Sequence, residues 1–583
     1  MRKIFLLIIL AFCLLVKDLN LAANPENDSS SGTKFIPPLN IPLYLTGTFG
    51  ELRPGHFHAG IDIKTQEEIG KPVFSIEEGY VARVKVQENG YGKALYINHP
   101  GGITSVYAHL DKFMDDIAAY VKEKQYEHQT FEIDLFPDAD RFVLNKSDII
   151  GLSGNTGGSL GPHLHFELRE TSSEKPMDPM KYYKDFKDNI KPGIRNIAFY
   201  AASKHSLVNH RNDKLIITPA YHEGEFHIED TILVSGKFGI GVETYDYMNE
   251  TNNRYGVKSV KLFSDSALHF HQQMEKFSFY ETRYINSLVD YEEKVKQNLN
   301  IQKLFIEPNN KLSTYRYTNN NGYLVYNDHR LHKIRIEIND FLSNQTFIEL
   351  NIKNAAHHPQ QKNQKQVAGD HIMPYQVSNS FKNPFVEVYF PAGCFYDTLH
   401  FDYEVKEMPS TGSYASPVHQ IHNPYTPVHK SYELKIKPEN LPEYLYPKTF
   451  IAYINGEDDN PYEYAGSETA DGFLKANPRK LGEFALIVDT ISPEIRPLNI
   501  FHDQDMSQED SIRLRITDEL SGISSYEGRI DGEWVLFEYD KKNDLLFYAF
   551  DENRLQMNKE HELVLKVSDQ VDNTSAFSIK FFK

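Results

Sequence analysis

The sequence predicts a mainly β protein that is divided into several domains. Short apolar and aromatic runs separated by Gly, Pro and Asn recur along the whole chain, and 36 Tyr with 37 Phe against a single Trp favour strands over helices. At 583 residues the chain is too long for one compact domain, and about 150 residues per domain gives roughly four. Hydrophobic residues make up 40% and charged residues 25%, which is typical of folded proteins and excludes wholesale disorder.

The N-terminus has the pattern of an export signal. Two basic residues precede an apolar run of 13 residues, 4–16, which is shorter than the roughly 20 residues that cross a bilayer. We therefore expect a signal peptide over 1–22, cleaved at Ala22 or Ala23, and a polar leader over 23–34. The protein is predicted to be exported to the periplasm, the cell envelope or the extracellular space.

Charge and cysteine content restrict the partners. The formal net charge of -19 argues against nucleic-acid binding, which needs a basic surface, and no later segment is apolar enough for a transmembrane helix. A lipoprotein signal at Cys13 is disfavoured because Phe12 is bulky where a small residue is expected. After signal cleavage only Cys394 would remain, so no intramolecular disulfide is expected, and its apolar neighbours indicate a small buried side chain.

Residues 35–189 read as a compact antiparallel β domain with one interruption. Strand-like segments such as ITSVYAHL and HLHFEL alternate with glycine-rich turns. Between them, Phe113, Ile117, Tyr120 and Val121 recur at helical spacing and precede the acidic segment FEIDLFPDADRF. This predicts a helix-containing insertion over about 113–147.

The remainder contains an internal repeat. HKIRIEINDFLSNQT from His332 aligns without a gap with HELVLKVSDQVDNTS from His561, and both alternate strictly before an Asp-led turn. The starts of the two units also correspond, as KPGIRNI and SPEIRPL. We predict immunoglobulin-like β-sandwiches over 190–353 and 490–583, with a β-rich middle domain over 354–489.

Three segments gather the residues of a metal site. FGELRPGHFHAGIDI places His58 four positions before Asp62, GNTGGSLGPHLHFEL places His163 two before His165, and SVYAHL supplies His109. Even spacing in an extended segment brings side chains to one face. Imidazole and carboxylate are usual zinc ligands, and three protein ligands with one open position are typical of catalytic zinc. For the His58/Asp62 pair or the His163/His165 pair taken alone, a surface or core histidine is the better interpretation.

Taken together and in this order, the HAGID, YAHL and GPHLHFEL segments resemble the lysostaphin/LytM-type zinc metallopeptidases, which cleave peptide cross-links of bacterial cell walls. The resemblance covers roughly residues 40–170. It implies an antiparallel β-sheet zinc peptidase domain of the duplicated-hybrid-motif type, one Zn²⁺ per chain, and peptidoglycan stem peptides or cross-bridges as substrate.

Carried over position by position, the resemblance makes His58, Asp62 and His165 the zinc ligands. His109 and His163 would be the catalytic histidines, since the chain has no HExxH motif to supply a glutamate base. Tyr107, two residues before His109, would either assist oxyanion stabilisation or belong to the core.

We expect a secreted zinc endopeptidase, D,D-specific for a Gram-negative substrate. One alternative is a non-catalytic LytM-like regulator or scaffold that binds wall or partner proteins, which the complete set of hallmark residues argues against. The other is that the β-rich tail is an adhesin or assembly platform. The chain departs from the family in the separation of His109 and His163, which are 54 positions apart. The insertion in that interval is expected beside the substrate groove, where it would restrict entry.

Overall fold

The computed structural model describes residues 35–183, 186–355, 371–409, 412–456 and 461–583. The predicted signal peptide and leader lie outside the described residues. Strands dominate the described part, so the prediction of a mainly β protein is confirmed. None of the helices that the structure describes is both long and apolar enough to cross a membrane.

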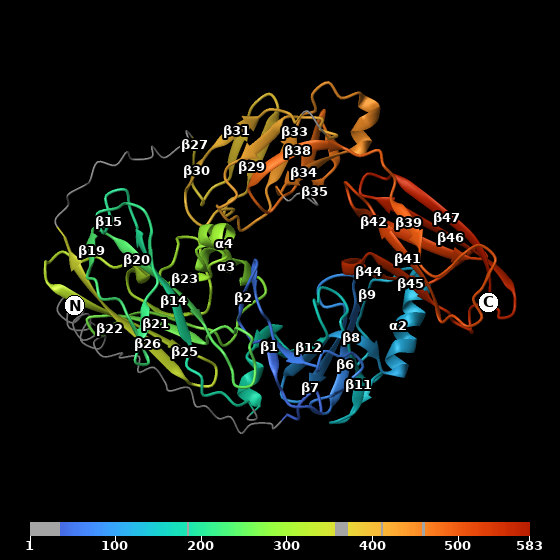
Figure 1. Ribbon diagram of the computed structural model, residues 1–583, viewed down its shortest axis with the longest axis horizontal. Coiled ribbons are helices and arrows are strands. Elements are labelled where there is room, and N and C mark those ends of the chain that lie inside the picture. Colours follow the sequence, from blue (N-terminus) through green and yellow to red (C-terminus); the bar gives the residue numbers. More distant parts are fainter. Residues whose placement is uncertain (1–34, 184–185, 356–370, 410–411, 457–460) are drawn as a thin grey trace, which may run out of the picture. The chain divides into compact units, whose positions relative to one another are not determined.

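One large antiparallel sheet organises the N-terminal region (Figure 1). Along its main path the order is β1-β4-β12-β8-β7-β6-β10, and four further strands pair beside this path. The main strands are β1 (Leu45–Gly47), β4 (Ile61–Lys64), β12 (His163–Glu170), β8 (Ile103–Phe113), β7 (Lys93–His99), β6 (Gly79–Val86) and β10 (Val143–Leu144). The others are β5 (Pro72–Phe74), β9 (Ile133–Leu135), β11 (Ile149–Ser153) and β13 (Lys175–Met177), while β2 (Leu52–Arg53) and β3 (His56–Phe57) form a separate hairpin.

The central strands of this sheet are buried on both faces. Six consecutive residues of β12 and seven of β8 are buried. Apolar side chains on the central strands supply the core, among them Val81, Val84, Leu95, Ile97, Val106, Leu164, Phe166 and Leu168. A strand surrounded in this way is a stiff support, which suits the precise placement that a site built from several strands requires.

The predicted helix in the interval between His109 and His163 is α2 (Asp115–His128). Its buried side chains are Ile117, Val121 and Gln125, four residues apart and therefore on one face. The chain then adds the short strands β9 and β10 to β6 before β11 returns to β8.

The repeated hairpins of the sequence are β25–β26 and β46–β47, each within a pair of sheets. The first pair contains β14 (Gly193–Ala201), β20 (Phe238–Tyr245), β21 (Ser259–Ser264), β22 (Ala267–Gln273), β25 (Leu331–Asn339) and β26 (Gln345–Asn354). The last pair contains β39 (Glu494–Pro497), β41 (Ser511–Thr517), β42 (Ile523–Ile530), β45 (Leu545–Ala549), β46 (Glu560–Asp569) and β47 (Thr574–Phe582). Strict alternation buries Ile334, Ile336 and Ile338 of β25 and their counterparts Leu563, Leu565 and Val567 of β46.

Two five-stranded sheets and the two-stranded sheet of β27 (His371–Met373) and β30 (Leu399–Phe401) form the described middle region. The five-stranded sheets include β29 (Val386–Phe390), β33 (Glu433–Ile436) and β37 (Phe473–Ala476) in one, and β32 (Val418–Ile421), β34 (Thr449–Ile454) and β38 (Gly482–Val488) in the other. Cys394 is buried among their apolar side chains, and burial raises the pKa of its thiol to about 12. It is therefore the small buried side chain that its sequence neighbours predict.

A candidate metal centre

Strand register brings the three predicted ligands together. In the β4–β12 ladder Asp62 lies directly opposite His165, and His58 precedes β4. Asp62 Oδ1 lies 3.1 Å from His58 Nε2 and 2.8 Å from His165 Nδ1, and the two ring nitrogens are 3.0 Å apart. All three side chains are buried, with at most 5% of each residue exposed.

Hydrogen bonds on the far side of each ring assign its tautomer. His58 Nδ1 lies 2.7 Å from the Thr48 carbonyl oxygen and donates to it, which leaves Nε2 as a lone-pair donor. His165 Nε2 lies 2.8 Å from Glu167 Oε1, so its Nδ1 is the free nitrogen. Orientation of metal-binding imidazoles by a carbonyl or a carboxylate is the usual arrangement in protein metal sites.

The three free atoms fit one zinc ion. A triangle with sides of about 3 Å has its corners about 1.7 Å from its centre, so a point above its plane lies within the usual zinc–ligand distance of about 2.0–2.2 Å from all three atoms. Two imidazoles and one carboxylate are also a donor set that zinc prefers. His58, Asp62 and His165 can therefore hold a zinc ion with a further coordination position left for water or substrate.

Charge in the centre favours an ionised Asp62. Burial alone would raise its pKa, but the neighbouring His58 and the polar contacts with His163 and His165 hold it well below the ordinary value. Arg53 of the β2–β3 hairpin adds a charge-assisted hydrogen bond to Asp62 Oδ2 at 2.6 Å. Oδ1 is thereby directed at the two histidines and Oδ2 at the guanidinium.

The two predicted catalytic histidines lie beside the ligands. His109 Nδ1 donates to the Thr156 carbonyl at 2.8 Å, and His163 Nδ1 donates to the Gly161 carbonyl at 2.8 Å. Their ring centroids are 4.8 Å apart, and His163 Nε2 lies 3.5 Å from Asp62 Oδ1. Burial, reinforced by the neighbouring His165 and His163, lowers the pKa of His109 to about 3, so that ring is neutral.

Tyr107 belongs to the core. It is fully buried, and its hydroxyl oxygen accepts hydrogen bonds from the Ile76 backbone N–H at 3.2 Å and from Ser105 Oγ at 3.1 Å. Two positions further on, His109 has a φ of +60°, a left-handed conformation that interrupts the alternation of an extended strand. Even spacing therefore does not put Tyr107 beside the histidines, and of its two predicted roles the structure supports core packing.

Sequence reasoning missed a buried network behind His165. Glu167 accepts from His165 Nε2, and its other oxygen accepts from Arg169 Nε at 2.7 Å. Tyr91 hydrogen-bonds to Glu167 Oε1 and stacks on the His165 ring with centroids 5.2 Å apart. The continuation HLHFE, in which Glu167 keeps the even spacing of the two histidines, was the available signal for the carboxylate.

The insertion, which pairs with β6 of its own domain, also contacts the last domain. Tyr126 of α2 packs edge-on against Trp534 with ring centroids 5.1 Å apart, and Lys122 Nζ lies 2.6 Å from Asp551 Oδ2. Neither contact involves one of the five predicted site residues. Control of substrate entry by the insertion stays a prediction.

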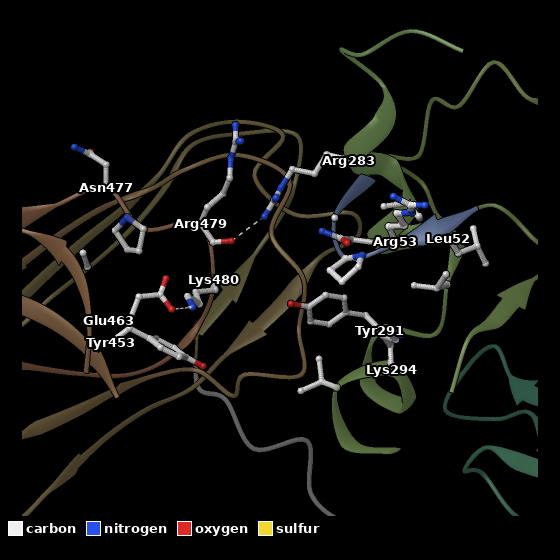
Figure 2. Close-up of a pocket in the computed structure, with 18 of the residues that line it drawn as sticks. Leu52, Arg53, Arg283, Tyr291, Lys294, Tyr453, Glu463, Asn477, Arg479 and Lys480 are labelled. Atoms are coloured by element: carbon white, nitrogen blue, oxygen red, sulfur yellow. Dashed lines mark hydrogen bonds and ion pairs between the residues drawn. The ribbon is translucent and has the colours of Figure 1, made fainter. Parts of the chain in front are cut away.

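Arg53 also lines a cavity of about 610 Å³ (Figure 2). Arg283, Lys294, Arg479 and Lys480 contribute further cationic side chains to its wall. Arg283 donates to the Arg479 backbone carbonyl at 2.9 Å, so its guanidinium there meets a neutral acceptor. The cavity thus combines a cationic wall with a side chain that hydrogen-bonds directly to a predicted metal ligand.

Comparison with known proteins identifies two regions. Residues 56–126 match Peptidase family M23, a stretch that includes His58, Asp62 and His109, and residues 370–489 match the Zu5-like domain. The chain therefore carries an M23 peptidase domain, and the resemblance to lysostaphin/LytM-type peptidases is confirmed. The Zu5-like match falls within the predicted β-rich middle domain.

Three curated relatives are each similar to about a fifth of the chain. An uncharacterized metalloprotease of Haemophilus influenzae is 33% identical over 119 residues, 20% of this chain and 19% of the relative. The DD-carboxypeptidase/endopeptidase Mpg of Neisseria meningitidis serogroup B is 30% identical over 129 residues, 22% of this chain and 23% of the relative. Lysostaphin of Staphylococcus simulans is 30% identical over 133 residues, 22% of either chain. The chain thus spans about a fifth of the length of these relatives.

Proposed function

Because the chain carries an M23 peptidase domain, we propose that it is a zinc-dependent endopeptidase that hydrolyses peptide cross-links of peptidoglycan. The convergence of His58 Nε2, Asp62 Oδ1 and His165 Nδ1 within 3.1 Å of one another carries this proposal. A relative named for DD-carboxypeptidase/endopeptidase activity supports D,D specificity. The complete set of five histidine and aspartate positions favours catalysis over the non-catalytic regulator or scaffold.

The residues divide the work between binding and proton transfer. A zinc ion held by His58, Asp62 and His165 would polarise the scissile carbonyl and acidify water at the site. His109 and His163 each donate Nδ1–H to a backbone carbonyl, so each presents Nε2 as a base. Nε2 of His163 takes the proton of the attacking water and delivers it to the departing amine, whereas His109, with its pKa lowered to about 3, is the weaker base.

We also propose that the protein is exported. The basic residues and apolar run at the N-terminus support a cleaved signal over 1–22. N-terminal sequencing of the protein recovered from the envelope or medium of the producing cells tests this, with a start at residue 23 or 24 expected. Recovery in the cytoplasm with Met1 retained would reject export.

The proposed activity is tested by measuring zinc and wall digestion on the same preparations. Wild type should bind one zinc per chain and release cross-linked fragments from isolated peptidoglycan. His165→Ala should lose both zinc and digestion, whereas His163→Ala should keep most zinc and lose at least about 100-fold in turnover, the usual contribution of a general base.

Matched controls separate a lost site from a lost fold. His56 is an exposed histidine of the β2–β3 hairpin, and its ring contacts the Pro54 carbonyl. His56→Ala should leave the zinc content unchanged. Zinc-loaded wild type that digests neither whole peptidoglycan nor isolated cross-linked peptides would exclude the endopeptidase and favour the scaffold.

A further inference from the structure

The repeated hairpins of the two sandwiches close in the same way. After β25, Asp340 Oδ1 accepts from the Asn344 backbone N–H at 2.9 Å and Oδ2 from the Asn344 side-chain amide at 2.7 Å. At the end of β46, Asp569 makes the same two bonds with Asn573, at 2.8 and 2.7 Å. The structure thus repeats the sequence correspondence at the level of single hydrogen bonds.

A second carboxylate meets each of these turns. Asp188 lies before the first sandwich and Asp489 before the last one, and each caps the backbone N–H two residues further on, at 2.9 and 3.0 Å. The side-chain amide of Asn344 donates to the Asp188 carbonyl at 3.3 Å, and that of Asn573 donates to the Asp489 carbonyl at 2.9 Å. The entering segment and the turn are therefore joined at equivalent positions.

A third carboxylate completes each group. Asp246 directly follows β20, and Asp518 directly follows β41. In each group every carboxylate offers an oxygen within 4.8 Å of the others, the first group being Asp188, Asp246 and Asp340 and the second Asp489, Asp518 and Asp569. Two sandwiches of one chain thus carry the same triad of carboxylates.

The two triads differ in how their oxygens are satisfied. In the last sandwich, Asp489 Oδ2 accepts from Ser521 Oγ at 2.6 Å and Asp518 Oδ2 accepts from the Gly522 backbone N–H at 2.7 Å. In the first sandwich, Asp246 is only 4% exposed, and its buried Oδ1 has no hydrogen-bond partner among the described residues. A buried carboxylate oxygen without a donor is costly, which indicates that a ligand completes this site.

No Lys, Arg or His among the described residues forms an ion pair with Asp188, Asp246 or Asp340. The protein crowds negative charge here without supplying its own counter-charge.

We propose that Asp188, Asp246 and Asp340 bind one calcium ion. An all-oxygen donor set without nitrogen or sulfur is the preference of calcium, which takes six to eight oxygens and tolerates irregular geometry, so carbonyls and water complete the shell. The ion fixes the segment that precedes β14 to the end of β20 and to the β25–β26 turn. The site is independent of the peptidase centre, whose donors include two imidazoles.

Calcium binding to the zinc-loaded full-length protein tests the site, by equilibrium dialysis with radioactive calcium. Wild type should bind one calcium per chain. Asp246→Asn should weaken that binding at least tenfold, because the neutral amide removes the charge of the buried ligand. Asp518→Asn is the matched control at the equivalent position of the last sandwich and should bind calcium as wild type does.

A chelator distinguishes a lost ligand from a lost fold. With calcium removed, Asp246→Asn should have a Tm no lower than wild type, since it relieves repulsion among buried carboxylates, and calcium should raise the Tm of wild type and Asp518→Asn only. The proposal is overturned by no calcium binding in wild type, by unchanged binding in Asp246→Asn, or by magnesium competing equally well at equal concentration.

Discussion

Glu167 Oε1 accepts the Nε2 hydrogen of His165 at 2.8 Å, and this bond selects the nitrogen that His165 turns toward His58 and Asp62. Burial alone would lower the pKa of His165, but hydrogen bonds to Asp62 and Glu167 raise it to about 9. A metal ion must therefore displace a proton held there, so acid opposes metal binding at this residue.

Glu167→Gln tests the orienting bond. The loss of the charged acceptor should weaken zinc binding about 10- to 100-fold, the usual effect of removing the partner of a metal-binding imidazole. Breaking the buried pair with Arg169 should also lower the free energy of unfolding by about 3 kcal/mol. Zinc competition with a chelator measures the first effect and denaturant unfolding the second.

Glu170→Gln is the control for that experiment, because Glu170 lies on the same strand but is partly exposed and bonds to Ser173. It should change neither quantity by a measurable amount. An unchanged zinc affinity in Glu167→Gln would show that His165 is oriented by its ladder position alone.

His109→Gly and His109→Ala separate backbone strain from chemistry. At a φ of +60° glycine is unstrained, whereas an alanine Cβ is disfavoured by about 1–2 kcal/mol. His109→Gly should therefore be more stable than His109→Ala by about that amount. Both variants should keep zinc and lose wall digestion, as measured on the same preparations. Equal stability of the two would contradict the strained conformation.

Tyr107→Phe should affect stability and leave turnover unchanged. The substitution removes the acceptor of the buried Ile76 N–H and should lower the free energy of unfolding by about 1–3 kcal/mol. Tyr80→Phe, which removes a hydroxyl bonded to Asn98 at a less buried position, should have a smaller effect. A tenfold loss of kcat in a stable Tyr107→Phe protein would restore the oxyanion role.

Asp178→Asn should change the pH dependence of stability. Burial raises the pKa of Asp178 from 3.8 to about 6, and its Oδ2 has no partner among the described residues. Between these two pH values the folded state holds a proton that the unfolded state has lost. The contribution of the protonated Asp178 to the free energy of unfolding is therefore complete below pH 4 and is lost as the pH rises through 6. The asparagine variant should gain about 3 kcal/mol on wild type over that interval. Denaturant unfolding at several pH values measures this difference, and a difference independent of pH would refute it.

The sequence allowed the metal centre to be predicted because the HAGID, YAHL and GPHLHFEL segments occur together and in the order that resembles lysostaphin/LytM-type peptidases. His163 and His165 share a face as expected, and pairing of β4 with β12 supplies Asp62. Sequence periodicity could not predict the geometry at positions where the backbone of a strand is not extended. His109 has a left-handed backbone, and its ring is directed by a carbonyl of a loop 47 residues away.

The partners behind the ligands were harder to predict. Arg53 reaches Asp62, nine residues further along the chain, from the β2–β3 hairpin, and the sequence pattern did not predict this hairpin. Similarly, Asp340 and Asp569 were predicted as turn residues, which they are. The carboxylates that join Asp340 lie about 90 and 150 residues before it in the chain. Those that join Asp569 lie about 50 and 80 residues before it.

The direct pairing of Asp62 with His165 has a consequence for assembly. A slip of one residue between β4 and β12 would send one of these side chains to the opposite face of the sheet. Only the native register places both ligands on one face, so only chains with that register would bind the metal. If the metal binds late in folding, it stabilises only the chains in which β4 and β12 are paired in the native register. The atoms that select this register are the ligands that later serve the reaction.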